Sequence, residues 1–274
     1  MRATPVAPAK QTGRATSLAR YRPLFRNLVR REVRQRYKGS VLGLAWTLVT
    51  PAIMVGAYSL VFRFLFKIDI PHYALFLFVG LTAWQFFLVG IQMACTSLVV
   101  NANLVKKVSV PRAILPLAAM TGNAVTAAAM LAVGLPLCIW LTEGSLAPLA
   151  MVPLVVLLLG MLTVGLGLAC AAINVYFRDV EHIIAAVSLP WIFVTPIFYQ
   201  FDKVPGIDEY SWLEPVLHWA NPVTPPVIAL QQCLFWGAWP SAGDMVYSAI
   251  AGVVALAIGW RVFRRLEGEM AVEL

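Results

Sequence analysis

The sequence predicts an all-α membrane protein with six transmembrane helices, an N-terminal amphipathic interface helix and re-entrant helices on the outer side. Of its 274 residues, 60% are hydrophobic and only 12% are charged, and the mean hydropathy is +0.78. A soluble domain has about 25% charged residues, so this chain lacks the polar surface to face water on all sides. A bilayer requires about 20 mainly apolar residues per helix. The segments that meet this length are residues 41–66, 73–100, 114–141, 149–177, 183–199 and 245–263.

The N-terminal arm precedes the first apolar segment. Residues 1–17 are expected to be a disordered cytoplasmic lead-in, because they are rich in small residues and proline. Residues 18–40 are predicted to form a helix, since apolar residues recur with a helical period between arginines. We expect its apolar stripe to lie in the acyl boundary of the inner leaflet and its arginines to contact lipid phosphates. The alternative is a plain cluster of charges that only sets the topology.

The distribution of basic residues predicts the topology. With the N-terminus inside, 18 of the 21 Lys and Arg residues fall on the inner side. The positive-inside rule therefore predicts cytoplasmic termini, both on the same side because the number of spans is even. A basic arm leading directly into an apolar span fits a membrane anchor better than nucleic-acid binding. We expect a multi-pass membrane protein, in contact with lipids and without a nucleic-acid partner.

The predicted membrane interior lacks the groups that ion-coupled transport and catalysis require. None of the six apolar cores contains Asp, Glu, His or Lys, which line proton and cation paths. The chain has no phosphate-binding loop of the G-x-x-x-x-G-K-[ST] type. Asp179, Glu181 and His182 are crowded into one short turn, which favours a polar hinge over a metal site. We therefore expect no enzyme activity, no metal and no cofactor in this chain, and if transport is ATP-driven, the ATPase must be another polypeptide.

Two connecting segments carry additional signals. The inner loop at residues 101–112 is short and basic, and it is either a plain connector or a short helix offered to a cytoplasmic partner, with Lys106 and Lys107 at the rim. The outer stretch at residues 200–244 contains an apolar segment, residues 227–239, that is too short to span. Asn221-Pro222 precedes this segment. The outer stretch is either re-entrant and caps a pathway from outside, or a folded loop that lies on the headgroups.

Aromatic residues are concentrated in the first, second and fifth predicted spans. Aromatic faces stack on the C–H faces of sugars without a fixed hydrogen-bond pattern, as a sliding polymer requires. The alternative is that they form interface belts and helix packing. The candidates for contact with a polymer are Tyr58, Phe62, Phe66, Trp84, Trp191, Phe198 and Tyr199.

Three motifs together resemble a known family. The first is the run Arg36-Tyr-Lys-Gly-Ser-Val-Leu-Gly-Leu-Ala-Trp46 followed by Pro51. The second is Asn174-x-x-Phe-Arg-Asp-x-x-His182, and the third is Asn221-Pro222. This combination resembles the ABC-2 type permeases that export polysaccharides such as O-antigen, capsule and teichoic acid. The likeness extends from the arm to the sixth predicted span.

The resemblance implies a homodimer of six-helix subunits bound to two copies of a cytoplasmic ATP-binding subunit, which would hold ATP and Mg²⁺. It implies that the arm is an interface helix, that residues 101–112 form a coupling helix and that residues 177–182 make a further contact with the ATPase. The implied coupling residues are Asn101, Asn103, Lys106, Lys107, Arg112, Arg178, Asp179 and His182. Asn221 and Pro222 would belong to an outer gate, and spans one, two and five would line the channel.

The substrate implied by the resemblance is a lipid-linked polysaccharide. A guanidinium group can make bidentate bonds to phosphate, so the arm would receive the pyrophosphate of the lipid carrier, with Arg30, Arg31 and Arg34 as the candidates. The alternatives are an ABC-2 exporter of a drug or lipid and, from another class, a six-span membrane enzyme or scaffold. The Arg36–Trp46 run argues against the first of these.

Overall fold

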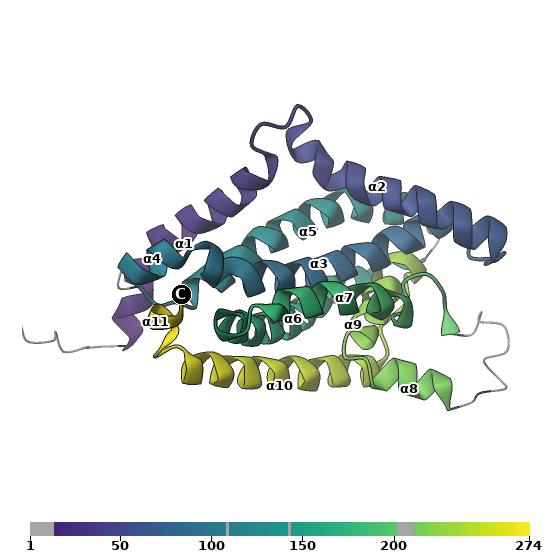
Figure 1. The fold of residues 1–274 in the computed structure, drawn as a ribbon. Coiled ribbons are helices and arrows are strands. Elements are labelled where there is room, and N and C mark those ends of the chain that lie inside the picture. The colour runs from purple at the N-terminus through teal and green to yellow at the C-terminus, as the bar shows by residue number, and fades with distance from the viewer. Residues whose placement is uncertain (1–13, 108–109, 142–143, 202–209, 211) are drawn as a thin grey trace, which may run out of the picture.

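The computed structural model describes residues 14–107, 110–141, 144–201, 210 and 212–274, and within this part of the chain every regular element is a helix (Figure 1). The long helices are α1 (Arg14–Tyr37), α2 (Trp46–Ser59) with its π-helical extension η2 (Leu60–Leu65), α3 (Tyr73–Val100), α5 (Ile114–Leu141), α6 (Val152–Tyr176), α7 (Asp179–Val194) and α10 (Ala242–Leu266). The short ones are η1 (Gly43–Ala45), α4 (Ala102–Lys107), η3 (Ala147–Met151), α8 (Leu213–Trp219), α9 (Thr224–Gln231), η6 (Gln232–Trp236) and α11 (Met270–Glu273).

Five of the described helical segments are long and apolar enough to cross a membrane. They are Trp46–Arg63, Tyr73–Val100, Ile114–Leu141, Ala147–Tyr176 and Ala242–Leu266. They correspond to the first, second, third, fourth and sixth predicted spans. The all-helical membrane architecture is therefore confirmed, whereas the count of six spans stays a prediction.

The fifth predicted span, residues 183–199, corresponds to a shorter helix than expected. Helix α7 has 16 residues and ends at Val194, and the backbone at Thr195 is extended with ψ 133°. Thr195 precedes Pro196, and the ring of a proline disfavours helical geometry in the residue before it. The apolar run continues to Tyr199, but the helix does not.

The N-terminal arm begins earlier than predicted. Residues 1–13 of the expected lead-in lie outside the described residues, and α1 begins within the remainder, at Arg14. The turn between α1 and α2 lies in the Arg36–Trp46 run. Gly39 and Gly43 have φ values of +81° and +50° there, a region that residues with a side chain rarely adopt. A Cβ on either glycine would meet no atom within 4 Å, so these glycines serve the backbone conformation and not close packing.

The core has two parts arranged along α3. The larger cluster surrounds the first half of α3 and includes α9 and η6, and the smaller one lies around the C-terminal part of α3 and the start of α5. Helices α6 and α10 pack backbone to backbone, since a Cβ on Gly259 would lie 1.9 Å from the carbonyl oxygen of Gly165. Gly252 of α10 likewise approaches Leu158 of α6, so the two helices pack closely over several turns.

The arm and the short helices gather at the two opposite ends of the bundle of long helices (Figure 1). We call the end that holds α1, α4 and α11 the arm end, and the end that holds α8, α9 and η6 the cap end. Helix α11 contacts both α4 and α6, and the Tyr176 hydroxyl at the end of α6 donates to the Leu266 carbonyl at 2.8 Å. The turn from α6 to α7 therefore lies at the arm end as well.

The outer stretch folds into the bundle. Pro225 and Pro226 lie in the first turn of α9, where a missing N–H costs nothing. Helix α9 is buried and contacts α3, α6, α8 and α10. Helix α9 is therefore not a loop that merely rests on the headgroups. That the outer stretch is re-entrant stays a prediction.

Candidate functional site

The arm helix presents a stripe of arginines away from the protein. Arg22, Arg26, Arg30 and Arg34 are exposed, and their spacing of four residues puts them on one face. On the opposite face Leu28 is only 6% exposed and packs in the smaller core cluster, with its apolar neighbours partly buried around it. The sequence predicted that the apolar stripe opposite the arginines lies in the acyl boundary of the inner leaflet, and for Leu28 this is wrong because the protein covers it.

The three arginines proposed to receive pyrophosphate lie around one hollow at the arm end. The hollow has a volume of about 650 Å³. It is lined by Asn27, Arg30, Arg31, Arg34, Gln35 and Lys38. Among the described residues, the lining contains four cations and no carboxylate, so it forms a positive concavity suited to an anion.

Arg31 connects this hollow to the start of α4. Its Nη2 donates to Asn101 Oδ1 at 2.7 Å and to Glu32 Oε1 at 3.1 Å. Asn101 follows the last residue of α3, and its Nδ2 donates to the Ser97 carbonyl at 2.8 Å. Two of the predicted sites, the arginine cluster and the coupling segment, are thus joined by one hydrogen bond across 70 residues of sequence.

Arg36, the first residue of the family-like run, is bonded to the interior of the bundle. It donates to Thr126 Oγ1 and to Asn123 Oδ1, each at 3.2 Å, and contacts the sulfur of Met93. Asn123 is 4% exposed, and its Nδ2 donates to the Phe86 carbonyl at 2.9 Å. Asn123 is not among the residues predicted from the sequence. The signal for it was an amide inside an otherwise apolar span, which requires a partner when buried.

The predicted coupling segment forms a short helix. In α4, Val105 is buried and anchors the helix, while Asn103, Lys106 and Lys107 are exposed. Residues 108–109 lie outside the described part, and Arg112 beyond them is half-buried. Of the two alternatives for this loop, a helix with basic residues on its open face is the one observed.

The second predicted contact lies at the same end. Arg178, Asp179 and His182 are all exposed, at the turn and in the first turn of α7. The carboxylates of Asp179 and Glu181 lie near the N-terminus of α7, where a negative charge is favourable. No group of three or more His, Cys, Asp or Glu that could hold a metal occurs in the part of the chain that the structure describes. These residues offer a polar, open surface at the arm end.

The predicted channel aromatics form two packed clusters. In the first, Phe198 is central. Its ring stacks on Phe62 at 5.0 Å and on Phe193 at 5.3 Å, and it meets Tyr58 edge-on at 4.8 Å. Phe66 extends this cluster by stacking on Phe62. The cluster therefore joins the end of α2 to the segment after α7.

The second cluster lies around Trp191 of α7. Its ring meets Trp84 at 5.9 Å and Phe87 at 5.3 Å, both edge-on. Trp84 and Phe198 are buried in the protomer, with Phe198 0% exposed, whereas Phe66 is 65% exposed. The hydroxyl of Tyr199 donates to backbone carbonyls at the end of α7. In this conformation the buried rings support the clusters, and only the exposed rings present a face to a ligand.

Asn221 fixes the turn before α9 to the end of α7. Its Oδ1 accepts from Trp191 Nε1 at 2.9 Å and from the Val223 amide at 3.2 Å. Its Nδ2 donates to Thr195 Oγ1 at 2.9 Å. The neighbouring Pro222 is half-buried. The residues predicted for an outer gate thus belong to a hydrogen-bonded connection between the cap end and the fifth predicted span.

A family model and three known proteins that match this chain agree with one another. The model of the family described as ABC-2 type transporter matches residues 23–235. A protein from Myxococcus xanthus called O-antigen export system permease protein RfbA is 29% identical over 258 residues, which covers 93% of this chain and 96% of that protein. Two proteins of the same name from Klebsiella pneumoniae are 25% and 24% identical, each over 89% of this chain and 92% of their own length.

Proposed function

Because the chain belongs to the ABC-2 type transporter family, we propose that it is the permease subunit of an ATP-driven exporter of a lipid-linked, O-antigen-like polysaccharide. The observation that carries this proposal is the likeness to O-antigen export permeases over about nine-tenths of the chain. The arginine hollow at the arm end supports it, since an anionic lipid carrier requires such a site on the permease.

In this proposal α7 is the fifth of six spans and both termini are cytoplasmic, in the bacterial inner membrane. The alternation of the long helices between the arm end and the cap end supports this topology (Figure 1). The arm, α4, the turn before α7 and the end of α10 all carry basic residues on the same side, as the positive-inside rule requires. The arm end therefore faces the cytoplasm.

The working unit is a homodimer. Helices α2 and α7 are little buried within the protomer, although both are strongly apolar. Exposed side chains include Ile53 of α2, Leu60 at the start of η2, and Ile183 and Leu189 of α7. These faces would meet lipid or the second subunit, and the polymer would pass along the seam between the two copies. The exposed rings of Phe66, directly after η2, and Phe193 of α7 would contact it.

The carrier pyrophosphate would bind in the arginine hollow from the inner leaflet. Arg30 and Arg34 are exposed and free to turn toward a headgroup, while Arg31 already bonds to Asn101. Guanidinium groups bind phosphate through paired, charge-assisted hydrogen bonds. The lipid tail would remain among the membrane lipids.

The driving force would come from two copies of a cytoplasmic ATP-binding subunit, which hold the ATP and Mg²⁺. This chain would act as a transport subunit and not as an enzyme. The exposed face of α4, with Lys106 and Lys107, and the exposed polar residues that start α7 would receive the ATPase. Since α11 contacts both α4 and α6, the two contact points would move as one unit.

We expect deletion of the gene to remove the polysaccharide from the cell surface and to cause lipid-linked polymer to accumulate on the cytoplasmic side. The measurement is immunoblotting of surface polymer together with extraction of the lipid-linked pool, and complementation with the wild-type gene is the control. Unchanged surface polymer, with loss of export of a drug or a simple lipid, would contradict the proposal in favour of another exporter of the same family.

A further inference from the structure

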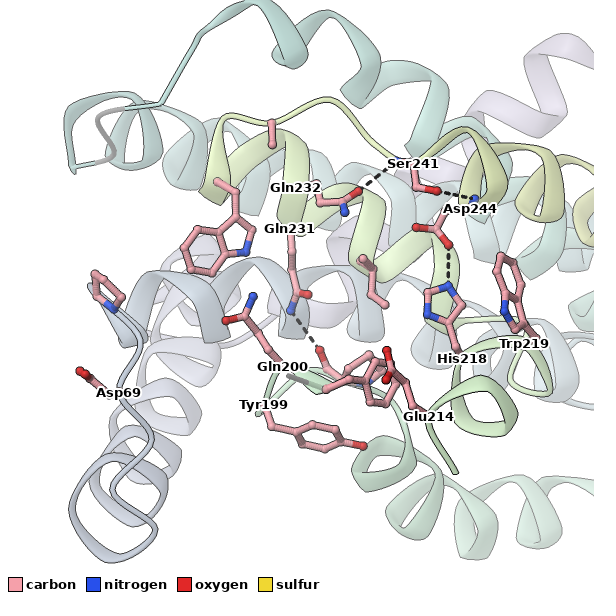
Figure 2. A pocket seen from close by; sticks show the side chains of 16 residues that line it. Asp69, Tyr199, Gln200, Glu214, His218, Trp219, Gln231, Gln232, Ser241 and Asp244 are labelled. Atoms are coloured by element: carbon pink, nitrogen blue, oxygen red, sulfur yellow. Dashed lines mark hydrogen bonds and ion pairs between the residues drawn. The ribbon is translucent and has the colours of Figure 1, made fainter. Parts of the chain in front are cut away.

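A second cavity lies at the cap end, remote from the arginine hollow. Its volume is about 780 Å³, within the range of pockets that enclose ligands of drug size. Figure 2 shows that its walls come from the segment before α3, the segment after α7, and α8, α9, η6 and the start of α10. None of the roles proposed above uses this cavity.

Aromatic rings form part of the cavity wall. Trp219 and Trp236 line it from α8 and η6, and both indole rings are exposed, Trp236 by 36%. Tyr199 lines it from the segment after α7. Its hydroxyl donates to the carbonyl of Phe193 at 3.1 Å, so its ring is held in place. Such rings offer flat apolar faces at the edge of a polar cavity.

Amide side chains line the same cavity and are held by hydrogen bonds. Gln231 Nε2 donates to the Pro196 carbonyl at 3.2 Å, and Gln232 Oε1 accepts from the Ser241 amide at 3.2 Å. Gln200 lies beside them (Figure 2). Each amide has further hydrogen-bonding atoms beyond those used here. The cavity therefore combines fixed donors and acceptors with ring faces.

The charge of the cavity distinguishes between classes of ligand. Among the described residues, its lining includes the carboxylates of Asp69, Glu214 and Asp244 and the imidazole of His218, but no Lys or Arg. Asp244 Oδ1 lies 2.6 Å from His218 Nε2, which joins α10 to α8 (Figure 2). An anionic pyrophosphate would be repelled here, in contrast to the arm end. Hydroxyl groups of a neutral ligand would instead donate to the carboxylates of Asp69 and Glu214, which are exposed, whereas Asp244 is buried against His218.

We infer that this cavity is a binding site for a short stretch of neutral polysaccharide on the outer face of the permease. Ring faces, amides and carboxylates, with no Lys or Arg among the described lining residues, match the C–H faces and hydroxyls of sugars. The inference rests on the proposed function, because only a permease for a polysaccharide presents polymer to this face. The site receives the polymer after it leaves the membrane and disfavours its return.

The experiment uses the permease–ATPase complex in nanodiscs. The probe is the cell's own polysaccharide, cleaved from its lipid by mild acid. Hydroxyl-radical footprinting read by mass spectrometry is expected to show that the probe protects Trp236 and Trp219 from oxidation but leaves Trp239 unprotected. Trp239 is the matched control, because it is 58% exposed on the same outer segment and does not line the cavity.

Affinity provides a second readout. Trp236→Ala is expected to weaken binding of the probe by about threefold to tenfold, the loss of one aromatic stacking contact, while Trp239→Ala leaves it unchanged. Equal protection of Trp236 and Trp239, or equal affinity of the two variants, overturns the inference. If deletion of the gene abolishes surface polymer while the probe fails to protect Trp236, the outer site alone is wrong. If surface polymer survives deletion, the proposed function itself fails.

Discussion

Reversing the charge of both lysines of α4, by Lys106→Glu combined with Lys107→Glu, is expected to abolish polymer export while the permease stays in the membrane. Both side chains are exposed at the arm end, on the helix that we propose enters the ATPase. A partner surface that is complementary to two lysines is negative, and placing two glutamates against it costs several kcal/mol of binding free energy. Co-purification of the ATP-binding subunit with the variant should fall at least about tenfold. The measurement is quantitative pull-down, followed by the ATPase rate of any complex that remains.

The matched control for this variant is Arg261→Glu combined with Arg265→Glu. These arginines are also exposed at the arm end, near the end of α10, and their reversal changes the net charge equally. They lie outside the proposed contact, so pull-down and export should remain close to wild type. Equal losses in both double variants would mean that total charge at this end matters, and the role of α4 in coupling would be wrong.

Removing two cations from the arginine hollow, by Arg30→Ala combined with Arg34→Ala, is expected to block export at the stage of substrate binding. A hydrogen bond to a charged group contributes about 1.5–3 kcal/mol, so loss of two such contacts lowers the apparent affinity for the carrier by about a hundredfold or more. Lipid-linked polymer should accumulate while the ATP-binding subunit still co-purifies. The measurement is binding of radiolabelled lipid-linked polymer to the purified complex.

Arg22→Ala combined with Arg26→Ala is the control for the hollow. These residues belong to the same exposed stripe of α1 but do not line the hollow. The variant should lose only part of the general attraction between the arm and anionic lipids. Were this variant to lose carrier binding as severely as the first, the arm would act through its total charge and the hollow would not be a site. Arg31 is left intact in both variants, because its bond to Asn101 would confound the result.

Much of the bundle could be predicted from the sequence. The predicted spans at residues 73–100 and 114–141 match α3 and α5 at both ends, because polar residues and turns border long apolar runs there. The helical period of the arm also predicted α1. Hydropathy reports length and apolar character, and both are properties of a single segment.

Features that depend on contacts between segments could not be predicted. The period of the arm identified an apolar face but not what covers it, and Leu28 proved to pack against protein. The bonds from Arg31 to Asn101 and from Arg36 to Asn123 join positions 70 and 87 residues apart. The early end of α7 has a different cause, because it follows from a local effect of Pro196 on Thr195, which the apolar run did not reveal.

The candidate site was predicted in part. Arg30, Arg31 and Arg34 do lie around one hollow, because their spacing puts them on one side of one helix. The aromatics recur at helical spacing, yet spacing could not reveal that Trp84 and Phe198 are buried while Phe66 is exposed. The outer cavity escaped prediction, since its carboxylates come from three separate segments of the chain.

The central claim, ATP-driven transfer of a lipid-linked polysaccharide, is tested most directly in inverted inner-membrane vesicles. Vesicles that contain this permease and its ATP-binding subunit would be loaded on their outer, cytoplasmic face with radiolabelled lipid-linked polymer from the deletion strain. The account predicts that ATP makes the polymer resistant to an added glycosidase, and that vesicles without the permease give no protection. Polymer that remains fully digestible with ATP, in vesicles whose complex hydrolyses ATP, would contradict it.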